Sequence, residues 1–172
     1  MEEFENVIKE WRQENNLINV KYTFGADDWI YSIVYDLARK NNDQEMMNLI
    51  KARYINYMSK LLEHYENYAQ QIFERDIPQT LPLTPSRLLA DSADELFTMI
   101  ESRNYQFISL DEAMQDEIYQ SDLKYFNQIG TSWLQSVALE RKKPYLNEPE
   151  IDADTKKIWE GSQPLNLKII ER

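Results

Sequence analysis

The sequence contains no cysteine and only one histidine among its 172 residues. Without cysteine, the chain can form no disulfide, no thiolate zinc site, no iron–sulfur cluster and no cysteine nucleophile. A single histidine excludes any metal site that needs two imidazoles from one chain. We interpret this residue, His64, as a surface histidine, because it lies among charged and tyrosine residues of a long helical pattern.

Glycine and long apolar runs are also scarce. The three glycines are dispersed, so the sequence has no glycine-rich phosphate loop, and the lack of repeats leaves no clear linker. The longest apolar stretches, such as 29–35, are far shorter than the roughly 20 residues of a membrane helix. We therefore predict one domain at 1–143, a tail at 144–172 packed on it, and no membrane span. The acidic first residues lack the pattern of a signal peptide, which indicates a cytoplasmic protein.

Positive charge is in short supply, with 19 Lys and Arg against 30 Asp and Glu, a formal net charge of −11. This balance argues against nucleic acid or an anionic membrane as the main partner, because both attract a positive surface. Nine of the acids fall between residues 91 and 122. Their spacing does not match a calcium loop, so we interpret them as helix caps, first-turn acids and a solubilising surface.

Helical periodicity is the strongest signal in the sequence. One apolar, tyrosine-rich stripe without glycine or proline predicts a long helix at about 43–75. Further helices are expected after Asp27 and Asp28, after the capping box Ser92-x-x-Glu95, and near 4–11 and 132–141. A similar Ser-x-x-Glu pattern at Ser109 predicts a short acidic helix.

Three short segments have the pattern of strands. Apolar residues alternate with polar ones at 20–24 and again at 105–110. The segment 79–85 is apolar but contains prolines, which favours an edge strand or an ordered loop. Together with the helices, these segments predict an α/β fold in which parallel strands are joined by crossover helices.

Four segments, 26–31, 76–83, 104–113 and 129–134, resemble in order the C-terminal half of the polysaccharide deacetylase family. These carbohydrate esterases remove acetyl groups from glycans with a divalent metal ion. The resemblance implies a partial (β/α) barrel of a few mostly parallel strands with flanking helices. It also implies that the metal-binding half, with its metal ligands and general base, is absent from this chain.

The matching motifs are altered at three positions that carry chemistry in the family. Gly25 replaces the first acid of an Asp-x-x-Asp-Trp motif, of which Asp28 and Trp29 remain. Thr84 stands where the family has a histidine acid, and Gln135 stands where another histidine is expected. The resemblance therefore implies no catalytic residue, no metal ligand and no cofactor. It leaves Asp28, Trp29 and Thr84 as the remnant of a glycan-binding groove.

Several functional hypotheses remain open on the sequence. The first is a catalytically inactive deacetylase-like protein that binds a glycan or a protein partner, or that self-associates to cover open strand edges. The second is a helical scaffold or interaction protein built around the long helix. The third is a fragment of a longer metal-dependent glycan deacetylase. A purely structural interpretation of Asp28 and Trp29, as helix cap and core residue, stands beside all three.

Overall fold

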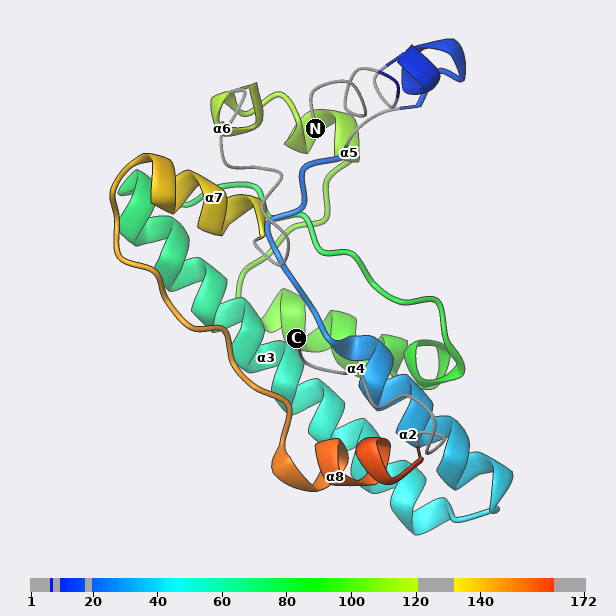
Figure 1. Cartoon of the computed structure of the whole chain (residues 1–172). Coiled ribbons are helices and arrows are strands. Elements are labelled where there is room, and N and C mark those ends of the chain that lie inside the picture. The colour runs from blue at the N-terminus through cyan, green and yellow to red at the C-terminus, as the bar shows by residue number, and fades with distance from the viewer. Residues whose placement is uncertain (1–6, 8–9, 18–19, 121–131, 163–172) are drawn as a thin grey trace, which may run out of the picture.

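The computed structural model describes residues 7, 10–17, 20–120 and 132–162 of the chain. The helices labelled in Figure 1 are α2 (Asp28–Lys40), α3 (Gln44–Phe73), α4 (Arg87–Ser102), α5 (Leu110–Ala113), α6 (Glu117–Gln120), α7 (Trp133–Glu140) and α8 (Ala153–Ser162). Residues 10–14 are also helical. The helix predicted near 4–11 falls largely outside the described residues, as does the start of the 129–134 motif.

The long helix α3 organises the fold and confirms the prediction of one helix at about 43–75. Its 30 residues span about 45 Å at the usual rise per residue. Asp43 caps its first turn by accepting a hydrogen bond from the Met46 N–H at 2.9 Å. The helices α2, α4 and α7 pack along it, and α8 packs on α2. One core therefore lies around the inner faces of α2, α3 and α4.

The core is rich in tyrosine, as the apolar stripe of the long helix predicted. Five tyrosines are among its most completely buried side chains: Tyr31, Tyr35, Tyr54, Tyr65 and Tyr68. Several of their hydroxyls reach polar partners at the margin, such as Tyr35, which donates to Asp91 Oδ2 at 2.8 Å. None of the described helices is both long and apolar enough to cross a membrane.

The predicted α/β fold is wrong, because the described residues form helices and contain no β-strand. The segments 20–24 and 77–83 do lie side by side. The Thr23 and Phe24 N–H groups donate to the Thr80 carbonyl at 3.1 and 3.4 Å, but the other hydrogen bonds between the segments use two threonine side chains. The Thr80 hydroxyl accepts from the Thr23 N–H at 3.0 Å and donates to the Lys21 carbonyl at 2.8 Å. The Thr23 hydroxyl accepts from the Thr80 N–H at 2.9 Å. These hydroxyls occupy backbone groups that a strand ladder would otherwise pair.

The third predicted strand, at 105–110, is also absent. The backbone of residues 105–108 makes no hydrogen bond within the part of the chain that the structure describes. Ser109 then caps α5 by accepting from the Glu112 N–H at 3.1 Å, so the helix begins where the strand was expected to continue. The partial barrel implied by the deacetylase resemblance is therefore wrong for the described chain.

Helix starts show where the sequence patterns hold and where they fail. The cap predicted at Ser109 is confirmed, and the helix predicted at 132–141 begins with a complete capping box of Ser132 and Gln135, which was not predicted. By contrast, α4 is capped by Ser86 and begins before the predicted box at Ser92, whose hydroxyl is buried and donates to the Leu88 carbonyl. Asp27 makes no side-chain cap at α2. The helix α4 therefore begins after Ser86, which provides a side-chain cap six residues before the predicted cap at Ser92.

The chain after α7 crosses back along α3 and leads into α8 (Figure 1). Arg53 of α3 holds this segment through Asp152 at 3.2 Å and Asp154 at 2.7 Å. The described part of the predicted tail therefore contains a helix that the sequence patterns did not indicate. Residues 163–172 of that tail lie outside the described chain.

Candidate functional site

Asp28 and Thr84, two of the three predicted binding residues, lie in direct contact. Asp28 is 4% exposed and accepts two hydrogen bonds from Thr84, one from its N–H and one from its hydroxyl, both at 2.7 Å. The pair ties the first turn of α2 to the segment that leads into α4. Because both carboxylate oxygens are engaged within the chain, this contact stabilises the fold at that junction.

Trp29, the third predicted residue, lies on a different surface. Its ring is 40% exposed and packs edge-on against Trp159 of α8, with ring centroids 5.4 Å apart. Its indole N–H donates to Asp27 Oδ1 at 3.3 Å. The structure thus brings Asp28 and Thr84 together and places Trp29 against α8. Glycan binding by these three residues stays a prediction.

Gln135, at the position of an expected histidine, holds a buried polar cluster together. It is 1% exposed, and its amide donates to Glu148 Oε1 at 2.9 Å and to the Tyr145 hydroxyl at 3.0 Å. The Tyr65 hydroxyl also donates to Glu148 and accepts from the Gly25 N–H at 2.9 Å. These contacts fasten the segment between α7 and α8 to α3.

Glu148 has an unusual electrostatic position in this cluster. Burial raises the pKa of Glu148 above its ordinary value, and the nearby Asp27 carboxylate adds to the shift, whereas the hydrogen bond from Tyr65 opposes it. Burial and the Glu148 charge raise the pKa of Tyr65 in turn. Glu148 borders a polar hollow that is also lined by Gly25, Asp27 and Ser132, and the Tyr65 hydroxyl accepts from the Gly25 N–H. The contribution of this cluster to the stability of the fold therefore depends on pH.

His64 is half-buried, so the prediction of a surface histidine is wrong. Its ring packs edge-on against Tyr65 with centroids 5.0 Å apart, and burial lowers its pKa. Within the described ranges, no group of three potential ligands from His, Cys, Asp and Glu is arranged to hold a metal ion. Burial against tyrosines favours a neutral imidazole at this position.

An apolar hollow lies between the three segments that were predicted as strands. It has a volume of about 600 Å³ and is bordered by Val20, Tyr22 and Phe24, by residues 77–83 and 105–110, and by Leu62 of α3, Phe97 and Ile100 of α4 and Ala113 of α5. We call it the apolar groove. None of the described residues that line it is charged.

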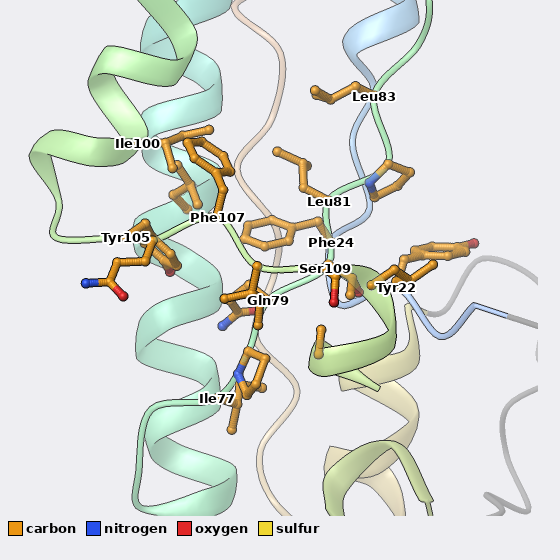
Figure 2. Close-up of a pocket in the computed structure, with 18 of the residues that line it drawn as sticks. Tyr22, Phe24, Ile77, Gln79, Leu81, Leu83, Ile100, Tyr105, Phe107 and Ser109 are labelled. Carbon is orange, nitrogen blue, oxygen red and sulfur yellow. The ribbon is translucent and has the colours of Figure 1, made fainter. Parts of the chain in front are cut away.

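The walls of the apolar groove face each other across its length. Figure 2 shows Leu81 and Leu83 on one wall and Ile100 and Phe107 on the other, with Phe24 between them. Five lining side chains are among the exposed large apolar residues of the molecule: Tyr22, Phe97, Phe107, Ile108 and Leu110. Such grouping on one surface is typical of a binding site, whereas scattered apolar residues are ordinary.

Polar groups without partners accompany this apolar surface. The backbone of residues 105–108 makes no hydrogen bond to any described residue, and the same is true of residues 81–83. The amide oxygen of Gln79, which also lines the groove, is buried and has no hydrogen-bond partner among the described atoms. The groove therefore offers both apolar contact and unused hydrogen-bonding groups.

Sequence reasoning missed the groove, although its signal was present. The alternating apolar residues of the predicted strands, such as Tyr22, Phe24, Leu81, Leu83 and Phe107, are those that line it. The pattern identified segments with one apolar side. It could not show that these sides border an open hollow, because that depends on how α4 and α5 are placed.

Comparison of the chain with protein-family models, with curated proteins and with solved structures finds no match in any of the three.

Proposed function

We propose that this chain is a helical interaction protein whose apolar groove binds an extended segment of a partner protein. The observation that carries the proposal is that exposed apolar side chains and unpaired backbone occur in the same stretch, residues 105–108. An extended segment can hydrogen-bond to such a backbone as an added strand does at a sheet edge. Alternate side chains of the segment then enter the groove.

A polypeptide fits this groove better than a purely apolar small molecule. An apolar ligand would cover the hydrophobic walls but leave the Gln79 oxygen and the backbone of 105–108 without partners. Burying such groups unpaired is costly, so the occupant needs its own donors and acceptors. A peptide backbone supplies both at regular intervals.

The helical framework supports this role by holding the groove open from one side. Leu62 of α3 and Ile100 of α4 form part of the groove lining, and both helices belong to the main core. The Asp28–Thr84 contact fixes the segment that carries Leu81 and Leu83. A preformed groove reduces the conformational cost of binding.

The test measures binding of a fluorescein-labelled peptide of alternating valine and threonine to the full chain by fluorescence anisotropy. We expect saturable binding that Phe107→Ser weakens by about tenfold or more, because truncating a central aromatic contact has an effect of that order. Phe107 is 59% exposed, so this variant keeps the fold. Leu49→Ser is the matched control, since Leu49 is exposed on α3 and does not line the groove.

A second peptide separates backbone pairing from apolar contact alone. The same sequence with alternate backbone amides N-methylated keeps its side chains but loses donors, and we expect it to bind at least about tenfold more weakly. Equal binding of both peptides would overturn the proposal in favour of a site for apolar molecules. Concentration-dependent dimerisation that Phe107→Ser abolishes would also overturn it, because a second copy would then be the occupant.

A further inference from the structure

Some acidic residues of the chain are paired with arginine, as in the pairs Arg75–Asp116, Arg87–Asp91 and Arg103–Glu66, whereas others make no ion pair with described residues. Four exposed acids make no ion pair with any described residue and lie next to the apolar groove: Asp94, Glu101, Asp111 and Glu112. We call these four residues the acidic rim.

The acidic rim borders the groove on two helices. On α4, Asp94 and Glu101 lie one turn before and one turn after Phe97, so they share the face that carries this groove residue. On α5, Asp111 and Glu112 lie between the groove residues Leu110 and Ala113. Phe97 and Phe107 meet edge-on with centroids 5.5 Å apart, which joins α4 to the segment that precedes α5 along one wall.

Stabilisation of the helices explains the positions of only two of the four acidic rim residues. Asp111 and Glu112 lie in the first turn of α5, where the helix dipole favours negative charge. Glu101 lies in the last turn of α4, which contains no basic residue, and negative charge there is unfavourable. Asp94 lies near the middle of the helix, away from both ends. The two α4 acids therefore bring no local benefit to the helix.

Two basic residues lie beside groove segments. Arg103 forms a two-pronged ion pair with Glu66, whereas Lys21 donates to the neutral Tyr119 carbonyl and keeps its positive charge. The groove thus has an uncharged lining and a margin on which the four rim acids outnumber the Lys21 cation. An occupant that matches both has an apolar centre and positive charge at its flanks.

We infer that the partner segment bound by the apolar groove carries Lys or Arg beside its alternating apolar residues, and that the acidic rim selects it. This inference rests on the proposed function, because it specifies the partner of the same groove. Exposed charges of this kind act mainly on specificity and on the rate of association, and salt screens them.

The test compares two labelled peptides with the same alternating valine–threonine centre, one flanked by lysines and one by glutamates, on the full chain. We expect the lysine-flanked peptide to bind on the order of tenfold more tightly at about 0.05 M salt, and the preference to shrink at about 0.5 M. The rim variant Asp94→Asn/Glu101→Gln/Asp111→Asn/Glu112→Gln should lose most of the preference.

A control variant changes the net charge by the same amount away from the groove. It carries Glu45→Gln, Glu74→Gln, Glu150→Gln and Glu160→Gln, all at exposed acids that do not line the groove and form no ion pair with described residues. This variant should keep the preference for lysine flanks. Loss of the preference in both variants would overturn the inference in favour of a general effect of net charge.

Different results would overturn the inference about charge and the proposed interaction function. Equal affinity for both peptides, with Phe107→Ser still weakening each, would overturn the inference about charge and leave the interaction function standing. Absence of binding by either peptide would overturn the proposed function itself, and the inference with it.

Discussion

The helical framework and the segments around the apolar groove are built from similar residues but are stabilised in different ways. In the framework, α2, α3 and α4 bury their apolar faces against each other, and some of their acids pair with arginine, as in Arg87–Asp91 and Arg103–Glu66. Around the groove, apolar side chains are exposed, backbone groups lack partners among the described residues, and nearby acids lack counter-charges. The difference indicates that the framework supports stability and the groove supports recognition.

The largest expected effect separates the two regions directly. Leu61→Ala, at a fully buried position of α3, should lower the free energy of unfolding by about 2–5 kcal/mol, because it leaves a cavity in the core. Phe107→Ala should change it by at most about 1 kcal/mol, since the ring is largely exposed. Urea unfolding followed by circular dichroism measures both values. Equal losses would show that the groove wall is part of the core.

The junction between the regions should give the next largest effect. Asp28→Ala removes a buried acceptor and leaves the Thr84 N–H and hydroxyl without it, so we expect a loss of about 1–3 kcal/mol in unfolding free energy. Thr84→Val keeps the backbone hydrogen bond to Asp28 and should cost less. A larger loss for Thr84→Val than for Asp28→Ala would contradict the assignment of Asp28 as the anchor.

The smallest effect concerns pH and has opposite signs in two variants. The raised pKa of Glu148 means that its protonated form stabilises the fold below the ordinary value near 4.5 and that this contribution is lost as pH rises through the folded pKa. Glu148→Gln keeps an uncharged side chain there. Its stability relative to wild type should therefore increase with pH over that range.

Asp116 provides the opposite case. The hydrogen bonds from Arg75 lower the pKa of Asp116, so its contribution is present above the ordinary value near 3.8 and is lost as pH falls through the folded pKa. Asp116→Asn should thus lose stability relative to wild type as pH rises. Urea unfolding at a series of pH values from about 3 to 8 tests both variants. Parallel pH profiles would contradict the assigned shifts.

The sequence predicted the local elements better than their assembly. The stripe of α3 and the starts of α5 and α7 follow from residues close together in the chain, and all are confirmed. The α/β fold failed because strand formation depends on distant partners. Between Thr23 and Thr80 the backbone hydrogen bonds are confined to the Thr80 carbonyl and side-chain hydroxyls make the other bonds, and at 105–108 no described partner is present.

In the candidate site, too, the sequence predicted residues better than the way they are arranged in space. Alternation identified several residues that line the groove but assigned them to strands of an α/β fold. The contact between Asp28 and Thr84 joins residues 56 positions apart, and neither its existence nor its two hydrogen bonds could be read from sequence spacing. The acidic rim was interpreted as capping and solubility, which accounts for Asp111 and Glu112 but not for Glu101.

The paired hydroxyls of Thr23 and Thr80 have a consequence for how the chain behaves at high concentration. Apolar segments with strand-like patterns are hazardous when their backbones are free, because identical copies can stack on one another into fibrils. Here each hydroxyl bonds to the backbone of the opposite segment, so two of the three segments are closed to such growth along that side. The chain can therefore expose an apolar groove to a binding partner while these hydrogen bonds limit its own assembly into fibrils.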